Sequence, residues 1–405
     1  MSHPRSCSGR IAAPPLEHRW SFIDCAAPAA EAGALMVPLE LHKTRITVDP
    51  FDLVVPEGRL HPAFRLLKES PAYSPARPMI REKVRLFDDV DGNFLEQFQS
   101  SGFDSRIWEL YLNTYFHEVG LQVSRDHRRP DFLLKKGDRT VFLEATTANP
   151  TQVNSVASVG QNDTLPATMG EAIEAMNNQV PIKLGSALFS KLSVRYWELP
   201  YVHDKPLVLA IEDFHEHFSL YYPSAALMGY LYGLDQDWHH DEQGKLIVVP
   251  QARNYHRHGR KQVPSGFFSL PGAENISAVM FSNSGTLPKF KRMGFLAGYG
   301  TSHVRLHRTG LCYDHDSNAA FPLRFEYQVG DPRFPEAWGQ GLDIFHNPQA
   351  SRPLPLGFFP DAADHWLDED GVIRGIVPPF HPIVSTTITL VIRDTEQGQS
   401  KNNAS

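Results

Sequence analysis

The sequence predicts an α/β protein in which helices precede and follow an antiparallel hairpin. Three observations predict this class. An apolar helical pattern runs from Asp104 to Gly120, two short apolar runs follow it closely, and a second helical pattern over 182–198 leads into the apolar run 206–211. Parallel strands need a long connection, and a helix usually supplies it. We expect a β-rich extension C-terminal to this core.

The first helix is predicted from its end signals and its apolar positions. Asp104 is a good N-cap, and Gly120 is the residue expected just after a helix. Glu109 lies between them, on a face shared with Leu112 and Phe116, so it fits either a functional carboxylate or an ordinary half-buried glutamate. The large apolar residues of this segment are Ile107, Trp108, Leu110, Tyr111, Leu112, Tyr115, Phe116 and Val119.

The two apolar runs after this helix, 132–134 and 141–143, predict an antiparallel hairpin. The sequence Lys-Lys-Gly-Asp-Arg between them is a turn sequence. If Gly-Asp forms a two-residue loop, Lys136 pairs with Arg139. This pairing fixes the register of the whole hairpin.

The same register places Asp131 opposite Glu144. Opposed side chains point to one face of a hairpin with their Cβ atoms about 5 Å apart. Two carboxylates that close repel each other unless a cation or a shared proton lies between them. A hard cation with oxygen ligands, Mg²⁺ or Mn²⁺, would resolve the conflict in this apolar hairpin. A longer loop would instead shift the register by one residue and turn one of the acids to solvent.

Asp131 after Pro130, Glu144 13 residues later in Glu-Ala-Thr, and Glu109 on the preceding helix resemble the PD-(D/E)XK nuclease superfamily. The resemblance covers about residues 95–215. It implies a restriction-endonuclease-like core of a helix, three antiparallel strands, a helix and a parallel strand. The corresponding segments here are the helix with Glu109, the strands Leu121–Ser124, Asp131–Lys135 and Thr140–Thr146, the helix Ile182–Glu198, and the strand Pro206–Ile211.

The resemblance implies that Asp131 and Glu144 bind the metal together with the backbone carbonyl of Ala145. Glu109 would act through water or on a second metal. The metal would polarise the scissile phosphate and generate hydroxide. The family's lysine is expected at position 146, where this chain has Thr146. Either catalysis is lost, or another lysine supplies the cationic group near the attacking water.

Lys191 is our candidate replacement for that lysine, and Lys183 is the reserve. In the predicted helix the two lysines and Ala187 follow one another at a spacing of four residues. They lie beside a stripe of three leucines that should pack on the sheet. A lysine at the edge of such a stripe can reach a buried site or extend its amine into water, and the sequence leaves both alternatives open.

Length and composition predict a globular protein with more than one region. The chain has 405 residues, of which 41% are hydrophobic. We expect an irregular or partly disordered segment over 1–80, a nuclease-like core over 81–300, a β-rich accessory region over 301–395 and a flexible tail over 396–405. No apolar run reaches the ~20 residues that span a bilayer. Three widely separated cysteines form neither a disulfide framework nor a zinc pattern, so a cytoplasmic location is expected.

The net charge of −7 is not typical of a protein that coats nucleic acid, although binding depends on local patches. Histidines offer another metal chemistry, because His215 and His217 could share zinc in a hydrolase. His239 and His240 are also adjacent, but the zinc-peptidase spacing is absent. Three basic segments are either phosphate contacts or solvated loops: Arg125–Arg129, Arg253–Lys261 and Lys289–Arg292.

The leading hypothesis is a Mg²⁺- or Mn²⁺-dependent nucleic-acid phosphodiesterase that uses metal-activated water. DNA is the expected substrate, and a homodimer is an expected assembly. The alternative is a catalytically inactive protein of the same fold that binds nucleic acid or a partner protein, which Thr146 motivates. The predicted catalytic residues are Glu109, Asp131, Glu144 and Lys191.

Overall fold

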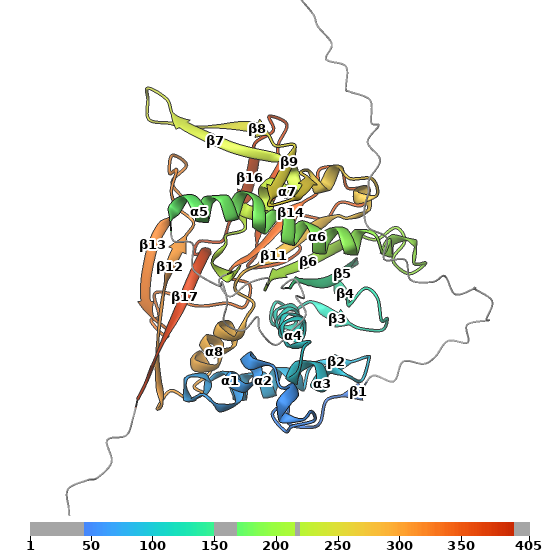
Figure 1. Cartoon of the computed structure of the whole chain (residues 1–405), viewed down its shortest axis with the longest axis vertical. Helices are drawn as coiled ribbons and strands as arrows, with labels where there is room; N and C mark the ends of the chain where they lie inside the picture. Colours follow the sequence, from blue (N-terminus) through green and yellow to red (C-terminus); the bar gives the residue numbers. More distant parts are fainter. Residues whose placement is uncertain (1–43, 150–167, 215–218, 393–405) are drawn as a thin grey trace, which may run out of the picture. The chain divides into compact units, whose positions relative to one another are not determined.

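The computed structural model describes residues 44–149, 168–214 and 219–392, and an eight-stranded sheet lies at the centre of this part of the chain (Figure 1). Its strand order is β16-β15-β14-β11-β6-β5-β4-β3. The predicted α/β class is therefore confirmed. In chain order these strands are β3 (Gln122–Ser124), β4 (Phe132–Lys136), β5 (Arg139–Ala148), β6 (Leu207–Asp213), β11 (Ala278–Ser282), β14 (Leu342–His346), β15 (Ala363–Leu367) and β16 (Ile373–Ile376).

Strand pairing changes direction along the sheet. β3, β4 and β5 pair antiparallel, and β5, β6 and β11 then pair parallel. β14 is antiparallel to β11 and parallel to β15, and β16 is antiparallel to β15 at the edge. The connection between the parallel strands β5 and β6 contains a helix, as such crossovers usually do.

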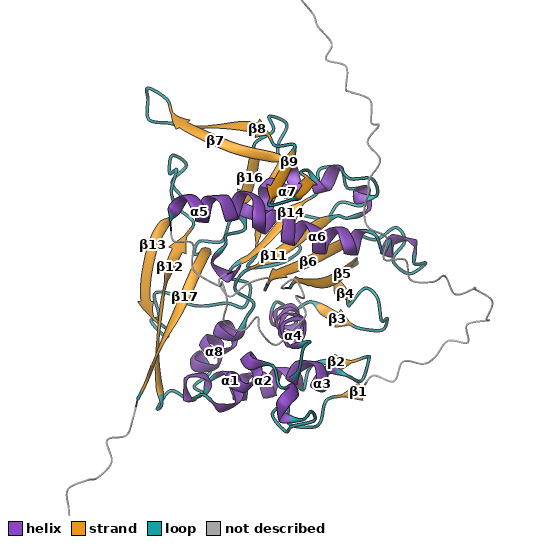
Figure 2. Cartoon of the chain, viewed as in Figure 1, coloured by secondary structure: helices purple, strands orange, loops and turns teal. Residues whose placement is uncertain are grey.

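Helices cover both faces of the sheet (Figure 2). Apolar residues of α6 and α7 pack in one core cluster, whereas those of α1 to α4 and α8 pack in another. Successive residues of β6 alternate between the two clusters, as the two-residue period of a strand requires. The helices are α1 (Pro62–Glu69), α2 (Ala76–Val84), α3 (Phe94–Gln99), α4 (Phe103–Glu118), α5 (Met169–Glu174), α6 (Val180–Leu192), α7 (Ala225–Tyr232) and α8 (Leu287–Leu296).

The register of the β4–β5 hairpin is the predicted one. Lys136 pairs with Arg139 and Phe132 pairs with Leu143. Gly137 takes a positive φ of 62° in the loop, which explains the glycine there. The alternative of a register shifted by one residue is therefore wrong.

Only the C-terminal end of α4 agrees with the end predicted from the sequence. Gly102 occupies the N-cap position and Asp104 lies in the first helical turn, so the prediction of Asp104 as N-cap is wrong. A carboxylate in the first turn still interacts favourably with the helix dipole. Gly120 follows the helix with a positive φ of 75°, as predicted for a residue at this end.

Residues 62–84 differ from the irregular segment that we expected over 1–80. They contain α1 and α2, and Phe64 and Leu67 of α1 are completely buried. Pro62 opens α1, where proline is favoured because no backbone donor is lost. Residues 1–43 lie outside the described part of the chain.

Within the expected accessory region 301–395, the described residues 301–392 are β-rich as predicted, but they contribute to two sheets. β12 (Val304–Cys312), β13 (Leu323–Gln328) and β17 (Pro382–Val391) form a separate sheet in the order β13-β12-β17. β14, β15 and β16 from the same range extend the central sheet. The expected boundary at residue 300 therefore does not separate one sheet from another. The expected tail, 396–405, lies outside the described residues.

The remaining strands form short two-stranded sheets. They are β1 (Thr44–Arg45) with β2 (Asp88–Asp89), β7 (Leu234–His240) with β8 (Leu246–Ala252), and β9 (Tyr255–His258) with β10 (Lys261–Pro264). Within the three described ranges, no helix has the length and apolar character needed to cross a membrane.

Candidate active site

A cavity of about 340 Å³ lies where β4 begins, beside the C-terminal half of β5. The predicted site residues Glu109, Asp131, Glu144, Ala145 and Lys191 all line it. So does Thr146, at the position where the family's lysine was expected. The structure thus brings the predicted residues to one cavity, although they approach it from different directions.

Asp131 immediately precedes β4 and faces the backbone of β5. Its Oδ2 accepts a hydrogen bond from the amide of Ala145 at 2.8 Å. The amide and the carbonyl of a strand residue point to the same side of that strand. The Ala145 carbonyl therefore faces the side on which Asp131 lies, just before β4 begins to pair with β5 at Phe132 and Leu143.

Glu144 is a buried residue of β5, and its two carboxylate oxygens have different surroundings. Oε1 accepts hydrogen bonds from Nζ of Lys191 at 2.6 Å and from the hydroxyl of Tyr196 at 2.8 Å. Oε2 is also buried but makes no hydrogen bond to any described residue. A buried carboxylate oxygen without a partner is costly, so this atom is a candidate ligand position.

The other two acids of the cavity, together with burial, strongly perturb Asp131. The pKa of Asp131 lies well above its ordinary value, first because burial disfavours the charged form and then because Glu144 and Glu109 are negative. Arg125 and the Ala145 amide oppose this shift but do not cancel it. A bound cation would favour the ionised carboxylate. The cavity therefore has the electrostatic conflict that the hairpin register predicts.

Glu109 does not join the other two acids directly, because it comes from the other face of the sheet. Glu144 points toward α6, whereas α4 covers the opposite face. Oε2 of Glu109 instead accepts hydrogen bonds from Arg106 at 2.7 Å and Arg125 at 3.2 Å. In the described segments, no three His, Cys, Asp or Glu side chains gather closely enough to form a metal-binding group. The cavity therefore offers two carboxylates, with the charge of Glu109 already balanced.

Lys191 is the lysine that reaches the site. It lies in the last turn of α6, and its amine contacts Glu144 as described above. Lys183 is two turns earlier in the helix, does not line the cavity, and acts electrostatically on Lys261. Of our two candidates, Lys191 therefore reaches Glu144 and the cavity. Thr146 lies on the same face of β5 as Glu144.

Tyr196 is a site residue that the sequence did not reveal. We predicted one helix over 182–198, but α6 ends at Leu192 and a 3₁₀ turn follows over Tyr196–Glu198. Arg195 takes a left-handed φ of 57° before that turn. On a continuous helix, Tyr196 and Lys191 would project about 140° apart. The break in the helix allows both side chains to reach the same oxygen of Glu144.

The basic segment Arg125–Arg129 is only partly a surface patch. The guanidinium of Arg125 is buried and lies over the rings of Phe87 and Phe132, at 4.3 and 5.0 Å from their centroids. It helps to hold Glu109, so it is not available to a phosphate. Arg128 and Arg129 are exposed.

The basic segment Lys289–Arg292 is not a surface patch at all. Lys289 and Arg292 are buried in α8 and contact Glu336, each at 2.9 Å. Arg308 lies 3.5 Å from the same carboxylate. The segment Lys289–Arg292 is therefore neither a phosphate contact nor a solvated loop, because Lys289 and Arg292 pair with the internal Glu336. The third segment, Arg253–Lys261, presents exposed Arg257, Arg260 and Lys261 near the β9–β10 hairpin.

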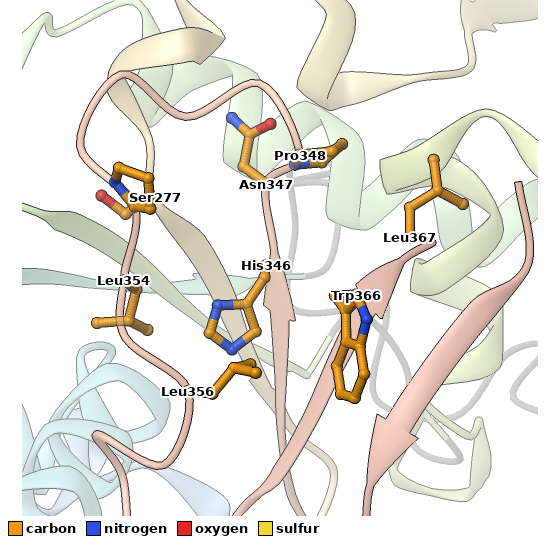
Figure 3. A pocket seen from close by; sticks show the side chains of 9 residues that line it. Ser277, His346, Asn347, Pro348, Leu354, Leu356, Trp366 and Leu367 are labelled. Carbon is orange, nitrogen blue, oxygen red and sulfur yellow. The ribbon is translucent and has the colours of Figure 1, made fainter. Parts of the chain in front are cut away.

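A second cavity of about 220 Å³ lies at the other end of the central strands (Figure 3). His346 and Trp366 line it, and Nε2 of His346 is 2.6 Å from a carboxylate oxygen of Asp364. The lining residues Ser277 and Asn347 use their side chains in hydrogen bonds to the backbone. This arrangement indicates a structural network beneath a small, mainly apolar pocket.

The histidines of the zinc alternative gain no support. His215 and His217 lie outside the described residues, and His239 and His240 are exposed on β7. In comparisons with known proteins, no family model, no curated protein and no solved structure matches the chain. The nuclease hypothesis therefore depends on the residues and geometry of the first cavity.

Proposed function

We propose that the protein is a Mg²⁺- or Mn²⁺-dependent phosphodiesterase that acts on nucleic acid, with DNA as its substrate. The single observation that carries this proposal is the buried Oε2 of Glu144, which has no hydrogen-bond partner in the described part of the chain and lies in a residue that shares its cavity with Asp131. The order α4, β3, β4, β5, α6, β6 supports it, because it follows the order of a restriction-endonuclease-like core. The cytoplasmic location and the homodimer remain predictions from the sequence.

The oxygens around the cavity suit a hard divalent cation. Asp131 and Glu144 offer one carboxylate oxygen each, and the Ala145 carbonyl faces the same side. Oxygen ligands with negative charge are those that Mg²⁺ and Mn²⁺ prefer. When bound, such an ion would act as a Lewis acid toward the phosphate and lower the pKa of a bound water.

The protein's own groups have separate roles in this proposal. The ammonium of Lys191 can orient the attacking water and offset charge that develops on the phosphate. Glu109 holds Arg106 of the cavity wall and the buried Arg125, so in this proposal it is a structural acid rather than a ligand. Thr146 places a neutral hydroxyl where the family has its lysine.

Replacing Glu144 with glutamine tests the proposal. The amide keeps the size of the side chain but removes the charge that a cation needs, so Mg²⁺-dependent cleavage of DNA should be abolished. Circular dichroism should show a folded protein. Glu198→Gln is the matched control, because its carboxylate is 54% exposed and pairs only with Arg195 among the contacts described. Unchanged cleavage by Glu144→Gln on plasmid, linear DNA and RNA would overturn the assignment.

A second candidate function has its own supporting observation. Lys191 already neutralises Glu144 at 2.6 Å, so this carboxylate is balanced without a metal. In a catalytically inactive protein of this fold, which binds nucleic acid or a partner protein, this ion pair alone would compensate the charge of Glu144. Calorimetric titration with Mn²⁺ separates the two functions, since the absence of binding to the wild-type protein favours the inactive one.

A further inference from the structure

One oxygen of Glu144 carries both hydrogen bonds of this carboxylate. Lys191 from α6 and Tyr196 from the following 3₁₀ turn donate to Oε1, at 2.6 and 2.8 Å. No group within residues 44–149, 168–214 and 219–392 donates to the other oxygen. The last torsion of a glutamate is soft, so two donors on one oxygen fix the orientation of the carboxylate plane and with it the position of the second oxygen.

The two donors differ in how firmly they are held. The side chain of Lys191 is 27% exposed and ends a flexible four-carbon stem. Tyr196 is only 2% exposed, and its ring belongs to the apolar cluster between α6 and the sheet. A phenol has two side-chain torsions and is fixed here by packing. Tyr196 is therefore the rigid donor and Lys191 the mobile one.

We infer that Tyr196 is a positioning residue: its hydroxyl holds Oε1 of Glu144 so that Oε2 is presented to a divalent cation. The carboxylate then keeps its orientation when Lys191 moves from Glu144 toward the attacking water or the phosphate. This inference rests on the proposed function and names a residue that the predicted catalytic set does not contain.

The environment of Tyr196 keeps it a donor. Burial raises the pKa of its phenol above the ordinary value, and the negative charge of Glu144 raises it further. The hydroxyl therefore stays protonated throughout the neutral pH range. Hydrogen-bond partners of metal ligands act in this way, by fixing the orientation of the ligand.

The experiment is a Mn²⁺ titration by calorimetry of the wild-type full chain and of Tyr196→Phe. Loss of such a partner weakens metal affinity by about 10-fold to 100-fold, and we expect a change of this size. The metal concentration for half-maximal cleavage should rise by the same factor, with kcat at saturating metal changed by less than about threefold. Tyr201→Phe is the matched control, since that hydroxyl donates at 2.6 Å to the carbonyl of Arg129 and not to an acid of the site.

A Mn²⁺ titration of Lys191→Met is an independent test, because it does not depend on the folding of the tyrosine variant. Because Tyr196 still holds Oε1 and a competing cation is gone, this variant should bind Mn²⁺ at least as tightly as the wild type. Weaker binding by Lys191→Met would overturn the inference, as would wild-type affinity in Tyr196→Phe. Failure of the wild-type protein to bind Mn²⁺ would overturn the proposed function itself, which distinguishes the two failures.

Discussion

Glu109→Gln separates the role that the sequence predicts for this acid from the role that its contacts indicate. The carboxylate of Glu109 is 10% exposed and lies between Arg106 and Arg125, whose side chains are 13% and 7% exposed. Glutamine keeps the shape but removes the charge that balances these two guanidiniums. We therefore expect a loss of stability without a loss of metal binding.

The size of the effect follows from the burial of these groups. Removing one partner of a buried ion pair costs about 3–5 kcal/mol, because the other charge is left without compensation. The entropy of unfolding is about 2.1 cal/mol/K per residue, or roughly 0.7 kcal/mol/K for the described part of this chain, so the melting temperature should fall by about 4–7 °C. The Mn²⁺ affinity should stay within about threefold of the wild type, since a lost ligand partner would change it by 10-fold or more.

Differential scanning calorimetry and Mn²⁺ titration measure the two quantities on the same sample. Glu96→Gln is the matched control, because its carboxylate is 55% exposed and pairs with a 60% exposed Arg59 at 3.1 Å. Exposed pairs contribute about 0–1 kcal/mol, so this control should melt close to the wild type. A wild-type melting temperature for Glu109→Gln together with a tenfold loss of Mn²⁺ affinity would show that Glu109 is a ligand after all.

Two further predictions concern other buried acids. Glu336→Gln leaves Lys289, Arg292 and Arg308 without their shared carboxylate, so it should lower the free energy of unfolding by about 3–5 kcal/mol in denaturant titrations; the exposed Glu326→Gln should not. The raised pKa of Asp131 means that protons compete with the cation above pH 3.8, so Mn²⁺ affinity should rise with pH, by up to about tenfold per pH unit, until that group is ionised. In the metal-free protein the folded state holds this proton more tightly than the unfolded state, so stability should fall as pH rises through the same pKa. A pH-independent affinity between pH 4 and 8, measured by calorimetry, would contradict the assignment of Asp131.

Local sequence rules were sufficient to predict the register of the hairpin and the position of Lys191 on its helix. The loop sequence predicted the pairing of Lys136 with Arg139, and the same register holds up to Phe132 and Leu143, the pair next to Asp131 and Glu144. Helical spacing placed Lys191 at the edge of the apolar stripe, from where its amine reaches Glu144. The register and the position of Lys191 on its helix follow from patterns within neighbouring residues, whereas its contact with Glu144, 47 residues away in sequence, follows from the fold.

Features that depend on distant segments could not be predicted in the same way. The charges of Lys289 and Arg292 are internal only because Glu336, more than forty residues later, lies against α8. The charge of Glu109 is compensated partly by Arg125. From the sequence we had assigned Arg125 to a basic surface segment. Tyr196 reached the site because α6 ends early, and helix boundaries are weakly specified by sequence.

The most direct test of the central claim is an anomalous-scattering map from crystals soaked in Mn²⁺. The proposed function predicts a peak in the cavity within coordination distance, about 2.0–2.4 Å, of Oε2 of Glu144, a carboxylate oxygen of Asp131 and the carbonyl of Ala145. A well-ordered cavity without such a peak, or a peak at other residues only, would contradict it.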